Sequence, residues 1–177
     1  MALRGPVKHR RGPRGKADFA VGPRAPKCPE TLRYALAVAT VLIASDLAAL
    51  RHELRTMLEG PDLLVEEAAS GPEVLDIVRE GGIDLAVLDL QISNMGAMAI
   101  CLEMRNEESY GAAEPVPVLM LLDRRPDVFL ARRSGAEGFL VKPLEPVRVR
   151  AAVRSLLAGG EYEDDALRPT TVRAAAR

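Results

Sequence analysis

An unbroken apolar run between two acids constrains this chain more than any other feature. Asp84-Leu85-Ala86-Val87-Leu88-Asp89 has four consecutive apolar residues, and Asn94 and Gly96 follow in a turn. A short apolar run bounded by turn signals predicts a strand that is buried on both faces, as in a parallel sheet. Asp89 then lies at the carboxyl end of that strand, where open α/β sheets collect ligands. A carboxylate there needs a cation or hydrogen-bond donors to offset its desolvation.

Four similar apolar runs and five helical patterns surround this strand. The other predicted strands are 39–44, 63–68, 116–122 and 138–141. The predicted helices are 45–58, 71–80, 97–106, 126–133 and 146–158. Ser70-Gly71-Pro72-Glu73 is a capping box that starts the second helix. Strand and helix alternate five times, which predicts an α/β fold: a doubly wound, five-stranded parallel sheet of flavodoxin-like (βα)5 topology, with helices on both faces.

Apolar residues at helical spacing predict which side of each helix faces the sheet. The expected inward residues of the first two helices are Leu47, Leu50, Leu54, Met57, Leu58, Val74, Leu75, Ile77 and Val78. For the third and fifth helices they are Met98, Cys101, Leu102, Val147, Val149 (or the stem of Arg150), Val153, Leu156 and Leu157, with Met104 as a further candidate.

Charge and composition divide the chain into three segments. Residues 1–39 hold nine Lys/Arg and two Asp/Glu, whereas residues 40–177 hold fifteen against twenty-three. Residues 1–38, rich in Pro, Gly and basic side chains, are expected to form a disordered arm. Residues 39–159 form the predicted domain, and 160–177 are a tail too short for another domain, so no integral DNA-binding domain is expected.

The composition also argues against several classes of protein. Cys28 and Cys101 are the two cysteines, and without a Cys/His cluster they indicate neither a disulfide framework nor a zinc site. The apolar stretch 34–44 is too short to span a bilayer and lacks the features of a secretory signal. A cytoplasmic protein is expected. Nucleic-acid binding through the basic arm is not favoured, because the arm has one aromatic residue, Phe19, and no groove-reading motif.

Three charged residues come just after strand ends: Asp46 after the first, Asp89 after the third and Lys142 after the fifth. In the flavodoxin-like strand order the first and third strands are adjacent and the fifth is close to them. The three side chains can therefore converge at the switch point of the sheet.

Residues 39–159 resemble the receiver domain of two-component response regulators. Four motifs carry the resemblance in the expected order: Val-Leu-Ile-Ala-Ser-Asp (41–46), Asp-Leu-Ala-Val-Leu-Asp-Leu (84–90), Pro-Val-Leu-Met-Leu (117–121) and Gly-Ala-Glu-Gly-Phe-Leu-Val-Lys-Pro (135–143). Each motif is weak alone, but the four together are specific.

The resemblance implies a role for each residue of the site. Asp89 would accept a phosphoryl group, and Lys142 would pair with the phosphoryl oxygens. Mg²⁺ would be held by Asp46, Asp89 and the backbone carbonyl of Gln91, with Ser45 as a weak or water-mediated ligand. Phe139 occupies the position of an aromatic switch residue, and the Lys142-Pro143 bond would be cis.

Several positions depart from the family pattern. Ser45 stands where receivers usually carry the first of two acids, which weakens the expected Mg²⁺ site. Leu122 stands in place of the Thr or Ser that donates to the phosphoryl group, and a lost hydrogen bond to a charged group costs roughly 1.5–3 kcal/mol. The next residue, Asp123, would add like-charge repulsion if it turned inward. The loop after Asp89 has Ser93 for the usual Pro, and Gly96-Ala97 for Asp-Gly.

Two functions therefore remain open. The first is a single-domain response regulator, which is not an enzyme beyond the Mg²⁺-dependent phosphorylation of its own Asp89 by a histidine kinase or phosphotransfer protein. Its target would bind the face formed by the fourth helix, fifth strand and fifth helix, where Arg132, Arg133, Phe139 and Arg148 are candidate contacts; a homodimer is also open. The second is a pseudo-receiver, a protein-interaction module that works without phosphate. A flavodoxin-like enzyme is disfavoured, because Ser45-Asp46-Leu47-Ala48 is not a phosphate-binding loop.

Overall fold

The computed structural model describes residues 38–164. The arm predicted over 1–38 and the tail beyond 164 lie outside these residues, except for residue 38 itself. The described part is a parallel sheet in the order β2-β1-β3-β4-β5-β6, with helices on both faces. No helix in this part of the chain is long and apolar enough to cross a membrane.

The strands lie where the apolar runs predict them. They are β1 (Ala39–Ala44), β2 (Leu63–Ala68), β3 (Leu85–Asp89), β4 (Val118–Leu122), β5 (Gly138–Val141) and β6 (Tyr162–Glu163). The predicted fold class is confirmed, but the count of five strands is one too low. β6 lies in the segment expected to be a plain tail, and its two residues are too few to produce a periodic apolar signal.

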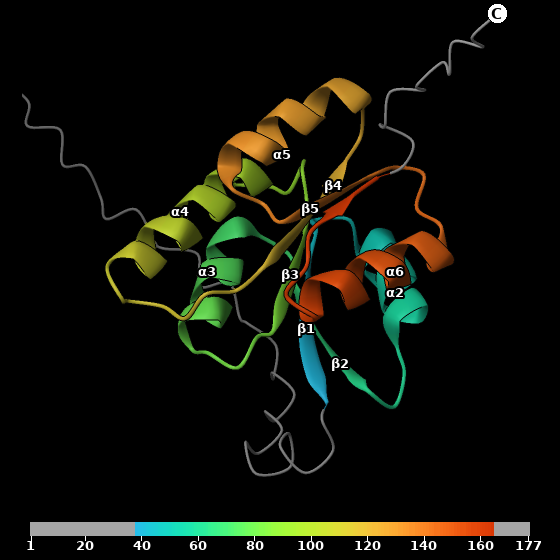
Figure 1. The fold of residues 1–177 in the computed structure, drawn as a ribbon, viewed down its shortest axis with the longest axis horizontal. Coiled ribbons are helices and arrows are strands. Elements are labelled where there is room, and N and C mark those ends of the chain that lie inside the picture. Colours follow the sequence, from blue (N-terminus) through green and yellow to red (C-terminus); the bar gives the residue numbers. More distant parts are fainter. Residues whose placement is uncertain (1–37, 165–177) are drawn as a thin grey trace, which may run out of the picture.

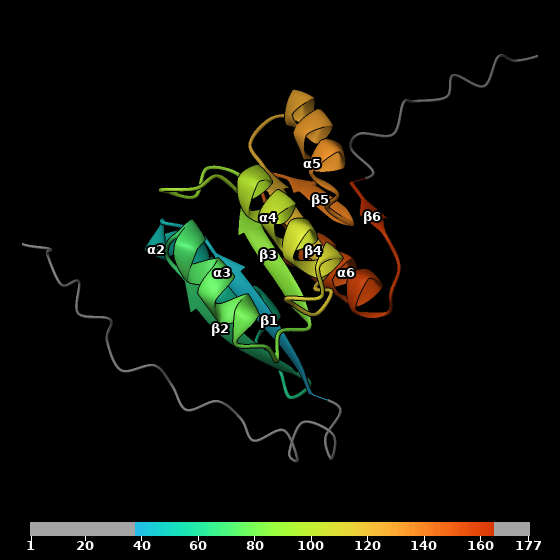
Figure 2. The same ribbon diagram turned by 90° about the vertical axis from the view of Figure 1, so that its left-hand side faces the viewer.

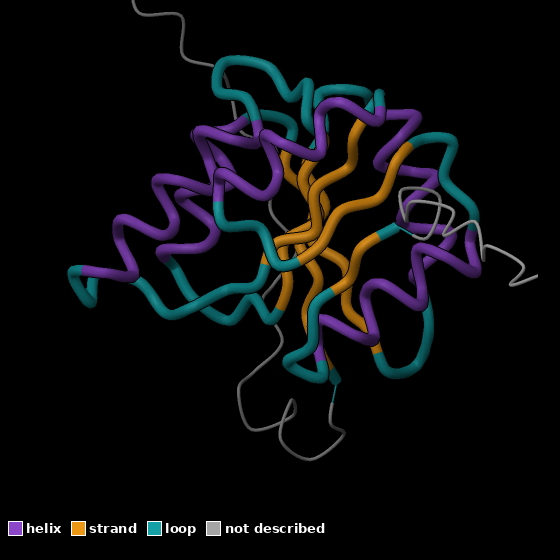
Figure 3. The backbone as a smooth tube through the Cα atoms, turned by 45° about the horizontal axis from the view of Figure 1, so that its top comes forward, coloured by secondary structure: helices purple, strands orange, loops and turns teal. Residues whose placement is uncertain are grey.

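The helices alternate with the strands on the two faces of the sheet. They are α2 (Ala48–Leu58), α3 (Gly71–Arg79), α4 (Ala97–Ser109), α5 (Val128–Ser134) and α6 (Pro146–Leu157), with a 3₁₀ turn, η1 (Arg125–Asp127), before α5. Figure 1 shows α3, α4 and α5 on one side of the sheet and α2 and α6 on the other. Figure 3 shows the strands running between these two helical layers.

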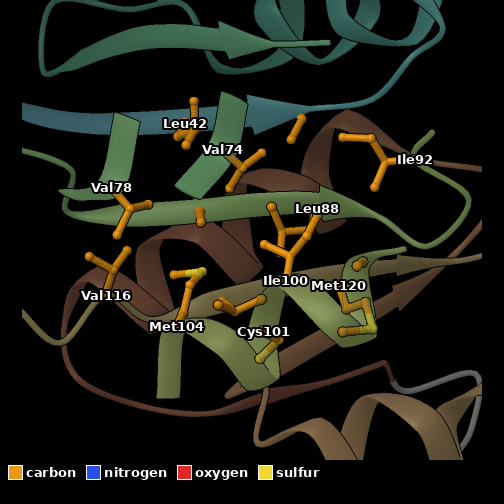
Figure 4. Close-up of a cluster of buried hydrophobic side chains, with 14 of the residues drawn as sticks. Leu42, Val74, Val78, Leu88, Ile92, Ile100, Cys101, Met104, Val116 and Met120 are labelled. Carbon is orange, nitrogen blue, oxygen red and sulfur yellow. The ribbon is translucent and has the colours of Figure 1, made fainter. Parts of the chain in front are cut away.

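Two apolar cores result, one on each face of the sheet. Side chains of β1, β3 and β4, such as Leu42, Leu88 and Met120, meet Val74 of α3 and Ile100 of α4 (Figure 4). On the opposite face Ile43, Val87 and Leu121 belong to a second cluster with Leu54 of α2 and Val153 of α6. Successive residues of each strand supply opposite cores, as strand geometry requires. The central strands β3 and β4 are therefore buried along their whole length.

Three residues predicted to face inward are exposed. Val147 is 79% exposed, because it lies two residues before the buried Val149 and so on the opposite side of α6. Leu102 of α4 follows the buried Cys101 and is turned outward, and Leu47 is exposed because it has extended backbone and precedes α2.

Candidate functional site

The register of the sheet brings the ends of four strands to one edge. Ala44 pairs with Leu88, Asp89 with Leu121, and Leu122 with Val141. The residues at or just beyond these ends therefore share the carboxyl edge of the sheet, which is where α/β folds place their ligands.

Asp89 is the buried centre of this edge. Its side chain is 1% exposed, and each carboxylate oxygen accepts a hydrogen bond from a different neighbour. Lys142 Nζ donates to Oδ1 over 2.7 Å, and Ser45 Oγ donates to Oδ2 over 2.8 Å. The ammonium group and the hydroxyl together offset the desolvation of the carboxylate.

Lys142 also contacts a second acid, a pairing that the sequence analysis did not predict. Its Nζ lies 3.0 Å from Asp123 Oδ1, just past the end of β4. Burial would lower the pKa of Lys142, but hydrogen bonds and charge attraction from Asp89 and Asp123 outweigh burial and raise it. The lysine is therefore a firmly protonated cation between two carboxylates. The Lys142–Pro143 peptide bond that follows is cis.

Asp46 is exposed and turned toward the loop after β3. Its carboxylate accepts a short hydrogen bond from Ser93 Oγ. The same loop packs closely on α3, because a Cβ on Gly71 would lie 2.6 Å from Cβ of Met95. Gln91 is in this loop, two residues after Asp89. The structure thus links Asp46 to the segment that carries Gln91, across the mouth of the site.

Ser45 is fixed by hydrogen bonds to Asp89, to the backbone before α2 and to a side chain of α2. Its Oγ accepts the N–H of Leu47 over 3.1 Å while donating to Asp89. Its carbonyl oxygen accepts from Arg51 of α2 over 2.6 Å. The serine is therefore an ordered donor to Asp89.

Leu122 and Phe139 share the apolar cluster on the α3–α4 face. Both are buried, and Leu122 has no exposed surface. The guanidinium of Arg132 on α5 lies 5.7 Å from the centre of the Phe139 ring, a cation–π arrangement. The side chain of Phe139 is packed inward. At the end of β4, Leu122 has a hydrocarbon side chain, which cannot donate the hydrogen bond that a hydroxyl would donate.

The donor chemistry of the site fits Mg²⁺. Asp46 and Asp89 supply carboxylates from β1 and β3, and the Gln91 carbonyl follows in the adjoining loop. Mg²⁺ commonly takes one or two protein carboxylates and keeps several waters. Among residues 38–164, no group of three or more His, Cys, Asp or Glu is placed so that it could hold a metal ion.

Of the predicted site residues, the structure brings Asp89, Lys142 and Ser45 into contact and pairs Asp46 with the loop after β3. The sequence reasoning missed three partners. Asp123 was expected only to repel charge if it turned inward, whereas it pairs with Lys142. Ser93 was noted as a departure from the family without a partner, and Arg51 was not noted at all. For Asp123, the available signal was an acid directly after a strand that ends beside the lysine strand.

Comparison with known proteins identifies the family of this chain. Residues 41–154 match the family model of the response regulator receiver domain. The match covers more than half of the chain, so the chain belongs to this family, and the resemblance stated from the sequence motifs is confirmed. It is therefore a response regulator receiver of two-component signalling.

The chain is similar to several individual response regulators. It is 38% identical over 97 residues to a response regulatory protein of Mycobacterium tuberculosis, covering 55% of this chain and 70% of that protein. It is 30% identical over 125 residues to the DNA-binding response regulator MtrA of Mycobacterium leprae, covering 70% of this chain and 53% of MtrA, about half its length. The solved receiver domain of the putative response regulator NarL of Mycobacterium tuberculosis aligns with a TM-score of 0.62 and 25% identity, over 69% of this chain and 98% of that one.

Proposed function

We propose that Asp89 accepts a phosphoryl group from the phosphohistidine of a kinase or phosphotransfer protein. The observation that carries the proposal is the 2.7 Å contact between Lys142 Nζ and the buried carboxylate of Asp89. In the transfer the phosphorus–nitrogen bond of the donor breaks and a bond from phosphorus to an Asp89 oxygen forms. The new phosphoryl oxygens carry the negative charge, and Lys142 is the cation within reach of them.

Mg²⁺ would supply the charge neutralisation that phosphoryl transfer requires. Asp46, Asp89 and the Gln91 carbonyl would hold it, with Ser45 contributing at most through water. Because Ser45 is neutral and already donates to Asp89, this set has one carboxylate fewer than the usual receiver. We therefore expect weakened Mg²⁺ binding.

The readout would be a protein contact on the face formed by α5, β5 and α6. Phe139 lies on β5 beneath Arg132 of α5, and Arg148 lies on α6, so the proposed switch and the proposed contact residues share this face. Receivers are typically signalling modules that catalyse nothing further, and we propose the same here. The cytoplasm remains the expected location.

The direct test is phosphoryl uptake by Asp89. The purified full chain is incubated with Mg²⁺ and acetyl phosphate, and intact mass spectrometry measures the gain of one phosphoryl group. We expect the gain in the wild type and its absence in Asp89→Asn. If acetyl phosphate does not phosphorylate the wild type and beryllofluoride does not bind to it at millimolar Mg²⁺, the proposal is wrong.

Leu122 favours a second candidate, a pseudo-receiver that binds its partner without phosphate. The buried hydrocarbon at the end of β4 removes a donor for the phosphoryl group. Ser45 meanwhile satisfies one oxygen of Asp89 in the unmodified state. Under this alternative, Asp89→Asn binds the same partner with unchanged affinity, whereas the first proposal predicts that phosphorylation changes the affinity.

A further inference from the structure

The sheet does not end at β5, although β5 is the last strand that the sequence predicts. Tyr162 and Glu163 form β6, which pairs in parallel with Gly138 and Phe139 at the edge of β5. Figure 2 shows β6 beside β5 at the side of the sheet between α5 and α6. The edge backbone that a partner would meet is thus already paired with the chain's own residues.

The backbone of β5 is shaped for this close approach. Tyr162 N–H donates to the Glu137 carbonyl over 3.1 Å. Gly138 has no side chain, and a Cβ there would lie 3.1 Å from the Tyr162 carbonyl oxygen. A larger residue at position 138 would push the added strand away.

Two arginines hold the acidic side chains of this segment, one from each flanking helix. Arg132 of α5 pairs with Glu163 over 2.8 Å, and Arg148 of α6 makes a short contact with Asp164. Asp164 is 1% exposed, and its Oδ2 also accepts the N–H of Val141 over 3.0 Å. The arginine and the strand-edge N–H together form a specific binding position for a buried carboxylate.

The connection between α6 and β6 is short and turns sharply. Gly159 ends the helix with φ near +78°, and Gly160 N–H donates to the Ser155 carbonyl over 2.9 Å. A short tether gives the attached segment a high effective concentration at the edge. Two paired residues can therefore occupy the edge, although such a short strand would bind weakly as a free peptide.

We propose that the edge of β5, with Arg132 and Arg148, is a docking groove for an extended acidic segment, and that residues 161–164 occupy it in cis. A partner would add a strand with an acid at each of the two positions that Glu163 and Asp164 fill, displacing β6. The proposal names the partner chemistry for the face given under the proposed function. It rests on that function only for the partner's role in signalling.

The groove is tested on the full chain with a labelled peptide of sequence Gly-Gly-Glu-Tyr-Glu-Asp-Asp (residues 159–165), followed by fluorescence polarisation without Mg²⁺ or phosphate donor. The double variant Glu163→Lys/Asp164→Lys frees the groove. We expect it to bind the peptide about tenfold or more tightly than the wild type, because the tethered occupant no longer competes. Adding Arg148→Ala should abolish the gain.

Matched controls separate the groove from a general charge effect and from misfolding. The α2 control, Glu53→Lys/Glu59→Lys, changes one exposed acid on α2 and one directly after it by the same charge, and should bind the peptide no better than the wild type. Glu163→Lys alone leaves the buried Asp164 intact and should give part of the gain. Circular dichroism confirms that each variant is folded.

Three results would overturn the proposal: no gain in either folded tail variant, equal binding by the α2 control, or a gain that survives Arg148→Ala. A wild-type dimer that Glu163→Lys dissociates would show that β6 is exchanged between copies, and would overturn its assignment as an occupant in cis. Because no phosphoryl chemistry enters the measurement, failure here leaves uptake by Asp89 untouched, and the reverse also holds.

Discussion

The chemistry of the site depends on which residue occupies each strand end. Asp89 is satisfied by one ammonium and one hydroxyl, and its neighbour Leu122 offers neither. Two of these positions, Ser45 and Leu122, can be changed to the residue type common in the family. The effect of each change can then be measured separately.

Leu122→Thr should increase phosphoryl uptake or lifetime at Asp89. The new hydroxyl could donate to the phosphoryl group, and a hydrogen bond to a charged group contributes roughly 1.5–3 kcal/mol. Uptake from acetyl phosphate is followed by mass spectrometry over time. Leu122→Val is the control, because it removes apolar volume from the same cluster without adding a donor; equal behaviour of the two variants would contradict the prediction.

Ser45→Asp should strengthen Mg²⁺ binding by roughly tenfold, since it adds a carboxylate to the donor set. It should also destabilise the metal-free protein, because Asp89 loses a donor and gains a like charge. Calorimetric Mg²⁺ titration and thermal unfolding with and without Mg²⁺ measure the two effects. Ser45→Asn, of similar size without the charge, should leave the affinity close to the wild type; a matching gain there would rule out the charge explanation.

Among the elements, α2 and β2 are joined by a charged cluster below the site. Glu67 of β2 accepts from Arg55 over 2.6 Å and from Arg51 over 3.1 Å, and Arg51 also holds the Ser45 carbonyl. Burial would raise the pKa of Glu67, but the two arginines outweigh burial and lower it below its ordinary value of about 4.5. The cluster therefore links helix position to the serine that contacts Asp89.

Glu67→Gln should lower the free energy of unfolding at pH 7 by no more than about 1 kcal/mol, since the carboxylate is partly exposed. A carboxyl with a lowered folded pKa stabilises above its unfolded pKa and loses that contribution as pH falls through the folded value. The difference between wild type and variant should thus shrink as pH falls below about 4.5. Urea unfolding across this range measures it, and a difference independent of pH would contradict the prediction.

The elements show how far sequence patterns reach. Apolar runs predicted β1 to β5, and the signal is clearest for β1, β3 and β4, which are buried on both faces. β6 was not predicted, because its pairing depends on Gly138 and on arginines of the two flanking helices. The capping box predicted at Ser70 does not form: Glu73 accepts from the N–H of Ala69, one residue before the N-cap, and Ser70 makes no side-chain cap.

In the site, too, sequence patterns predicted some features and missed others. Asp89 and Lys142 could be placed from strand ends alone, since parallel strands bring their ends to one edge. The contacts of Ser93 with Asp46 and of Asp123 with Lys142 join loops whose conformations no periodic pattern specifies.

Across the whole molecule, one sheet separates two cores that must fold together. Ile100 of α4 lies in one cluster and Leu54 of α2 in the other, and both are fully buried. The strands between them contribute alternate side chains to each. Loss of either core should therefore destabilise the other.

Leu54→Ala should cost about 2–5 kcal/mol and Ile100→Val about 0.5–1.5 kcal/mol of unfolding free energy. Because the sites are on opposite faces without shared partners, their effects should add within about 0.5 kcal/mol. Urea unfolding of both single variants and the double variant tests this, with one transition expected in each. Two separated transitions would show that the faces unfold independently.

The sharing of Lys142 has a consequence for the sensitivity of the switch. Two carboxylates, Asp89 and Asp123, hold a single ammonium group, so the pocket already has more negative than positive charge before any phosphate arrives. A phosphoryl group carries about −1.5 to −2 charge at neutral pH. Under the proposed function, the phosphoryl group would draw Lys142 away from Asp123, and the strength of that second contact would set the threshold at which the domain responds.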